Sequence, residues 1–119
     1  MPGWIKDRAR PVAEAQARSF RAAVEAGVPA VAGTDAGTPD NPHGGAAREV
    51  AFMAEAGLDV LLAVKAATGE AADLLGVSDR GVLRQGAAAD VLVAGGDVAA
   101  DITALQRPAA VFQDGRRVV

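Results

Sequence analysis

Two side chains that could act as acids, bases or ligands lie close together in a glycine-rich part of the chain. Asp35 lies in Gly33-Thr34-Asp35-Ala36-Gly37, shortly after the apolar segment 28–32, and His43 lies in Asn41-Pro42-His43-Gly44. The apolar, β-branched segment predicts a buried strand, and in α/β sheets and barrels ligands bind where the strands end. Asp35 is therefore the first candidate site residue, either as a metal ligand or as a general base.

Both side chains also have ordinary structural explanations. An aspartate after a strand can cap a loop by accepting backbone N–H bonds, and its spacing alone does not separate that role from ligand binding. His43 could donate to a substrate or titrate near neutral pH, but taken alone it fits a solvated loop histidine better. The glycines around it match neither the P-loop pattern nor G-x-G-x-x-G, so they predict no nucleotide site.

Composition limits the kinds of site and partner that the chain can have. It has 119 residues with one histidine and no cysteine, whereas a catalytic zinc site takes three protein ligands, often histidines. Such a site would need carboxylates or another chain to complete it. Lysine and arginine number 12 against 15 acidic residues and form no block, so nucleic acid is not the expected partner. We expect a cytoplasmic protein, because the sequence shows neither a signal peptide nor a membrane span.

The candidate residues must be positioned by elements that the hydrophobic pattern predicts. Helices are expected over 7–26, 46–56, 60–68 and 70–75, ending at or interrupted by Gly27, Gly57, Gly69 and Gly76. Asp59 is a plausible N-cap for the third of these helices. Arg48 and Glu49 are most simply the solvated first turn of the helix after the loop, and Arg48 as an anion-binding residue is the less favoured alternative.

After Gly76 the periodicity changes from helical to that of strands. Strands are expected over 81–84 and 89–93, and a hairpin over 110–113 and 116–119. The hairpin is predicted by Asp114-Gly115 between two apolar runs, because a type I′ turn needs a positive φ at both central residues.

Four linked motifs carry a resemblance to a known family. They are 26–28 leading into 33–37, then 41–44, then 66–68 with 71–76, and finally 80–83 and 86 followed by 89–93 and 111–116. In this order and spacing the chain resembles, from about Val12 to Val119, the C-terminal part of a metal-dependent amidohydrolase of the imidazolonepropionase-like and Xaa-Pro-dipeptidase-like branch.

The resemblance implies an α/β fold with two regions. Residues 1–76 would be the last βα portion of a (β/α)₈ metal-dependent hydrolase barrel, with the last strand and its flanking helices. Residues 77–119 would be part of a small composite β-sandwich. Asp35 would bind a divalent metal, with zinc as the expected ion, and would take the proton from the attacking water. His43 would contact the substrate, a small-molecule amide or cyclic amide.

The resemblance also implies that most of the family's metal ligands are missing. A barrel of this type takes roughly 250 residues. A His-x-His pair, a carboxylated lysine and two further histidines have no counterpart here, and neither Lys6 nor Lys65 takes the lysine role. We therefore expect the isolated chain to hold no metal tightly and to be inactive or nearly so, the short length reflecting a missing N-terminal part. The alternatives are a non-catalytic module that forms homo-oligomers through exposed edges, and half of a split enzyme completed by an N-terminal chain.

Overall fold

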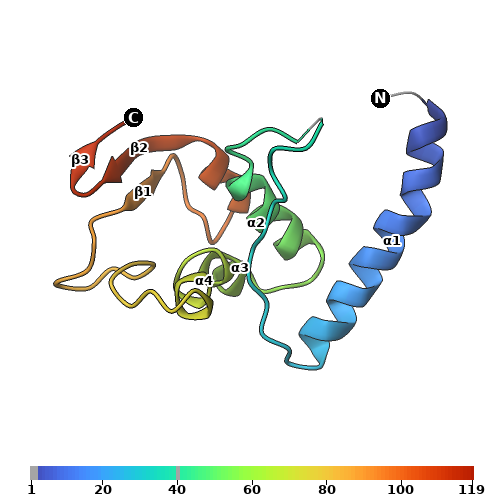
Figure 1. The fold of residues 1–119 in the computed structure, drawn as a ribbon, viewed down its shortest axis with the longest axis horizontal. Coiled ribbons are helices and arrows are strands. Elements are labelled where there is room, and N and C mark those ends of the chain that lie inside the picture. The colour runs from blue at the N-terminus through green and yellow to red at the C-terminus, as the bar shows by residue number, and fades with distance from the viewer. Residues whose placement is uncertain (1–2, 40) are drawn as a thin grey trace.

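The computed structural model describes residues 3–39 and 41–119 and combines four helices with one small sheet (Figure 1). The elements are α1 (Gly3–Glu25), α2 (Ala46–Glu55), α3 (Val60–Ala66), α4 (Gly69–Leu74), β1 (Val91–Ala94), the 3₁₀ helix η1 (Ile102–Gln106), β2 (Pro108–Gln113) and β3 (Arg116–Arg117). None of the described helices is both long and apolar enough to cross a membrane.

The first helix stands apart from the rest of the described chain (Figure 1). It ends as expected at Gly27, whose φ of 72° allows the left-handed cap that closes a helix. Only its C-terminal half approaches α2, where Phe20 packs against the core and the Arg21 guanidinium Nε donates to the carbonyl of Ala56 at 3.3 Å. The long helix is thus held at one end.

The strand expected over 28–32 does not form, so that prediction is wrong. The segment is extended but pairs with no strand of the described chain. The Val28 N–H closes the end of α1, and the Ala32 N–H donates to the carbonyl of Ala66 at 3.0 Å. Nor is the segment buried, because Val28 is 55% exposed. A strand needs a neighbour for its hydrogen bonds, and the described chain supplies none at this position.

The three short helices α2 to α4 follow the predicted pattern, and the core lies between α2 and α3. Asp59 caps α3 as expected, since its carboxylate accepts the N–H groups of Leu61 and Leu62 at 2.9 and 3.2 Å. The core cluster consists of Val50, Met53, Ala63 and Ala66. It is small because half of its members are alanines, and no large side chain in the described chain is fully buried.

The C-terminal region forms one antiparallel sheet in the order β1-β2-β3. Leu92 pairs with Val111, and Gln113 pairs with Arg116 around the tight turn. The predicted Asp-Gly hairpin is confirmed, because Asp114 and Gly115 have φ values of 49° and 74°. The strand expected over 81–84 is wrong: this stretch makes bends and no ladder, and Gly81 instead packs against the carbonyl of Thr68.

Candidate functional site

Asp35 lies in a tight loop whose shape is set by its neighbours. Its φ of 48° is one that few residues other than glycine, asparagine and aspartate adopt. The Thr34 hydroxyl accepts the N–H of Ala36 at 3.3 Å, and the amide of Asn41 donates to the carbonyl of Thr34 at 2.6 Å. The Gly37 N–H donates to the carbonyl of Asn41 at 2.9 Å. The Asp35 side chain is exposed and accepts none of these bonds, so the loop does not depend on its carboxylate.

The structure brings His43 against the Asp35 loop. A Cβ atom placed on Gly37 would lie 3.4 Å from Nε2 of His43 and 3.7 Å from its Cε1. The imidazole therefore packs next to a glycine, and the φ of 101° at Gly37 is one that residues with a side chain rarely adopt. Thus the only histidine of the chain and its first candidate carboxylate occupy one loop cluster.

Asn41 is the residue of this cluster that the sequence did not single out for its side chain. Its side-chain amide ties Thr34 to the far end of the loop, and its N–H donates to the carbonyl of Thr38 at 3.0 Å. The crowding of glycine, proline and asparagine indicated a turn. A bond across seven residues, however, leaves no trace in local spacing, and so the role of Asn41 follows from the structure alone.

The described residues do not by themselves fit a divalent metal. No group of three or more histidine, cysteine, aspartate or glutamate side chains lies together among them. A zinc ion takes three or four protein ligands, and the described residues of the Asp35 loop cluster offer one carboxylate and one imidazole. Ligands from outside the described residues would have to complete any metal site here.

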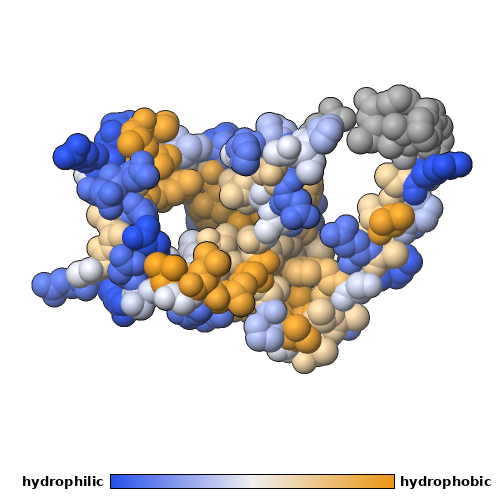
Figure 2. Space-filling view, viewed as in Figure 1, coloured by the Kyte–Doolittle hydropathy of each residue, from blue (hydrophilic) through white to orange (hydrophobic). Residues whose placement is uncertain are grey.

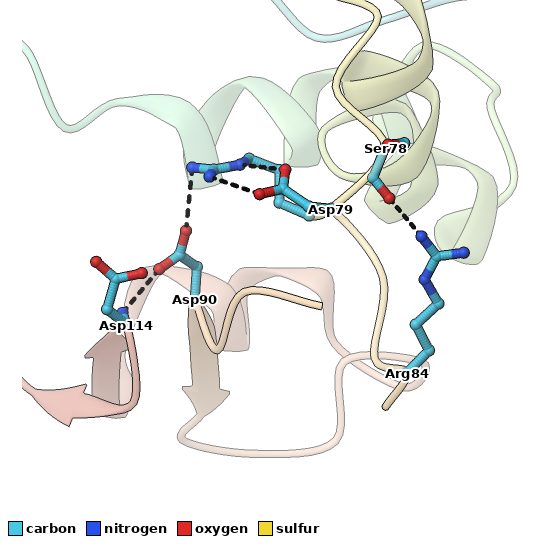
Figure 3. Close-up of polar contacts among 6 residues, drawn as sticks. Ser78, Asp79, Arg84, Asp90 and Asp114 are labelled. Carbon is cyan, nitrogen blue, oxygen red and sulfur yellow. Dashed lines mark hydrogen bonds and ion pairs between the residues drawn. The ribbon is translucent and has the colours of Figure 1, made fainter. Parts of the chain in front are cut away.

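Acidic residues elsewhere in the described chain make ion pairs that order loops. Figure 3 shows the carboxylate of Asp90, which accepts the N–H of Asp114 at 3.0 Å through one oxygen. Its other oxygen lies 3.7 Å from a guanidinium nitrogen of Arg80. Asp79 pairs with the same arginine at 3.1 Å. The side-chain hydrogen bond from Arg80 lowers the pKa of Asp79, against the opposing effect of desolvation. Arg84 donates to the carbonyl of Ser78 nearby. These contacts fasten the 77–90 loop to the sheet.

The sequence profile of the amidohydrolase family matches residues 7–118. The chain belongs to the amidohydrolase family. Among curated proteins, none matches the sequence significantly.

Several solved structures superpose on this amidohydrolase chain. A Xaa-Pro dipeptidase with methionine bound in its active site has a TM-score of 0.82 and 32% identity, covering 98% of this chain and 29% of its own. Molinate hydrolase has a TM-score of 0.77 and 27% sequence identity, and the match covers 85% of this chain and 26% of the hydrolase. The A. niger ochratoxinase has a TM-score of 0.75 and 30% sequence identity, and the match covers 91% of this chain and 25% of the ochratoxinase. The chain therefore spans less than a third of the length of these structures.

The family assignment agrees with the resemblance seen in the motifs, and it makes this a stretch of a (β/α)₈ barrel protein. The part of the chain that the structure describes contains a single three-stranded sheet beside the helices.

Proposed function

We propose that this chain is the C-terminal portion of a metal-dependent amidohydrolase that hydrolyses the C–N bond of amide or cyclic amide substrates, including dipeptides. The observation that carries the proposal is the family match over residues 7–118. The likeness to a Xaa-Pro dipeptidase, a molinate hydrolase and an ochratoxinase supports it, because each of these names is that of a hydrolytic enzyme. On this proposal residues 1–76 belong to the barrel and residues 77–119 to a composite β-sandwich.

Within that enzyme we assign Asp35 as the metal ligand and proton acceptor of the chain, and His43 as a substrate contact. Two features support the assignment. The Asp35 carboxylate is exposed and takes no part in holding its own loop, and His43 packs on Gly37 two residues away. The divalent metal, with zinc as the expected ion, takes its other ligands from the remainder of the barrel. For that reason the isolated chain is inactive.

The surface of the chain supports the idea that more protein covers it. A compact monomer of 11.9 kDa exposes about 5,900 Å², whereas this chain exposes 8399 Å². Its radius of gyration is 15.8 Å, against about 13.5 Å for a compact domain of this length. Surface of this extent is what a barrel segment presents when its neighbouring strands and helices are not in contact with it.

The test compares the isolated chain with a completed enzyme. The chain is produced alone and together with an N-terminal amidohydrolase segment carrying the His-x-His pair, encoded upstream or in an adjacent reading frame, and bound zinc and dipeptide hydrolysis are measured. The completed enzyme should bind zinc and turn over. Asp35→Asn should abolish turnover and keep the fold, since asparagine also tolerates a positive φ. Asp73→Asn, a matched change in α4, should leave turnover intact. Stoichiometric zinc and turnover by the isolated chain would overturn the inactivity.

A second candidate function is a non-catalytic module that forms homo-oligomers. The observation in its favour is the apolar surface, since Figure 2 shows hydrophobic side chains gathered across the lower middle of this face, over α3 and α4. The exposed large apolar residues of α3, of α4 and of the end of α4 are Leu61, Leu62, Leu74 and Leu75. The same surface would serve a complementing chain in a split enzyme, and the completed-enzyme experiment separates the two.

A further inference from the structure

The turn between β2 and β3 contains the pair of residues in this chain that is chemically least stable. Asp114-Gly115 is the only Asp-Gly pair in the sequence. Both residues are exposed, and their φ values are 49° and 74°. An aspartate followed by glycine isomerises more readily than other aspartates, because glycine has no side chain to hinder its own backbone nitrogen from attacking the preceding carboxyl group. The turn is therefore a candidate site of spontaneous covalent change.

The reaction needs no molecule other than water. The backbone nitrogen of Gly115 attacks Cγ of the Asp114 carboxyl group, and an N–Cγ bond forms while the N–H proton and a hydroxyl group leave as water. Water then adds to one of the two carbonyl carbons of the succinimide ring. Breaking the N–Cγ bond restores aspartate. Breaking the bond from the nitrogen to the main-chain carbonyl carbon of Asp114 gives isoaspartate, which has one more carbon atom in the main chain. No atom is oxidised or reduced.

In the folded chain the nitrogen that would attack is engaged in a hydrogen bond. The Gly115 N–H donates to the carbonyl of Ala89 at 3.0 Å, so ring closure has to break this bond. The N–H of Asp114 donates to the carboxylate of Asp90 at 3.0 Å, and Asp90 in turn lies 3.7 Å from Arg80 (Figure 3). The amides of both turn residues are thus bonded to the segment that leads into β1.

The strands on either side hold the turn in this conformation. Gln113 pairs with Arg116, and beyond this pair the Val118 N–H donates to the carbonyl of Val111 at 2.8 Å. The hairpin therefore has to separate from residues 89–90 before the Gly115 nitrogen can reach the Asp114 side chain. Local openings of this kind require less free energy than unfolding of the whole chain.

We propose that Asp114 is a site of spontaneous isoaspartate formation, and that its hydrogen-bond contacts with Asp90 and those of Gly115 with Ala89 prevent the reaction while the hairpin is folded. The additional main-chain carbon of isoaspartate does not fit a two-residue turn, whose backbone angles set the register of the strands. A modified chain therefore cannot restore the pairing of Gln113 with Arg116, and a transient opening becomes a lasting loss of β3. This inference is independent of the proposed hydrolase function.

The test follows isoaspartate in the 119-residue chain at neutral pH, both in buffer and in urea that unfolds it. Mass spectrometry with electron-transfer fragmentation locates the modified residue, because it distinguishes isomers of equal mass. Isoaspartate should accumulate first at Asp114, and about tenfold faster or more in the unfolded chain, the size expected when two hydrogen bonds have to break first. Equal rates in buffer and urea, or earlier isomerisation of another aspartate in the unfolded chain, would overturn the proposal.

Variants at position 90 separate the hydrogen bond from the charge. Asp90→Ala removes the acceptor of the Asp114 N–H and should speed isomerisation of the folded chain by about fivefold. Asp90→Asn keeps an acceptor oxygen and should isomerise like the unmodified chain, because an exposed ion pair contributes little to stability. Asp73→Ala, which removes an exposed carboxylate from α4, should also leave the rate unchanged.

Hydrogen exchange of the Gly115 amide, followed by NMR, measures opening of the hairpin in the same variants. Exchange and isomerisation should rise together in Asp90→Ala, because both require the bond to Ala89 to break. Unchanged isomerisation in Asp90→Ala would refute the protective role of these contacts. Equal acceleration in Asp90→Asn and Asp90→Ala would contradict the assignment to the hydrogen bond.

Discussion

At the level of single residues, two glycines are favoured at their positions for different reasons. At Gly37 a Cβ atom would lie in ordinary contact with the imidazole of His43, at 3.4 Å, so the positive φ of 101° is what favours glycine there. At Gly81 both the backbone conformation and the available space require glycine. Its φ is 78°, and a Cβ atom there would lie 2.7 Å from the carbonyl oxygen of Thr68 and 3.0 Å from the Cβ of Ala72. At Gly81, therefore, the absent side chain is what permits the close contact with α4.

The room available for a Cβ atom predicts that replacement by alanine lowers the free energy of unfolding more at Gly81 than at Gly76. Gly76 has a φ of 68°, and nothing lies within 4 Å of the position that a Cβ atom would take, so Gly76→Ala should cost only the left-handed strain of about 1–2 kcal/mol. Gly81→Ala carries that strain together with a backbone clash, which adds about 1–3 kcal/mol. Urea unfolding followed by circular dichroism measures both. Equal costs would mean that the 77–90 loop moves away from α4 without penalty.

At the level of elements, short polar contacts fix how the sheet follows the helices. Asp101 caps η1 by accepting the N–H and the hydroxyl of Thr103 at 2.9 and 2.6 Å, and Arg107 donates to its other oxygen at 3.1 Å. The side-chain hydrogen bond from Thr103 is the largest cause that lowers the pKa of Asp101 below its ordinary value of 3.8. The turn before β2 therefore depends on an ionised carboxylate.

The direction of that shift predicts an acid-sensitive turn. A carboxyl group whose pKa is lower in the folded state stabilises the fold above its unfolded value of 3.8, and this contribution is lost as the pH falls through the folded value. Urea unfolding between pH 6 and pH 2 should show stability falling below about pH 4. Asp101→Asn should reduce the loss of stability between pH 4 and pH 2, and Asp73→Asn should leave that loss unchanged. Identical profiles for Asp101→Asn and the unmodified chain would contradict the prediction.

At the level of the whole molecule, the chain exposes more surface than a compact monomer of its mass. Roughly 2,400 Å² separates its 8399 Å² from the area of a compact monomer of its mass. Leu83 is 86% exposed, while the fully buried side chains are alanines such as Ala63. The excess is larger than the about 800 Å² that one partner buries in a standard protein interface. The surface is therefore suited to being covered by further protein.

We accordingly expect the isolated chain to associate with itself. Light scattering after size exclusion should give a mass above 11.9 kDa that rises with concentration. Leu83→Gln should lower that mass because it removes a largely exposed apolar side chain, and Gln85→Ser, a polar change two residues away, should not. A monomer that melts cooperatively at every concentration would contradict this expectation, and with it the oligomerising module.

What the sequence determined by itself is the set of features that depend on near neighbours. Helix ends at Gly27 and Gly76, the Asp59 cap and the Asp-Gly hairpin all follow from the local conformational preferences of a few adjacent residues. The strands expected over 28–32 and 81–84 did not form, because a strand exists only when a distant segment supplies its hydrogen bonds. Tertiary structure alone placed His43 on Gly37 and brought the N–H of Gly115 to the carbonyl of Ala89, since contacts between segments far apart in the chain depend on how whole elements pack.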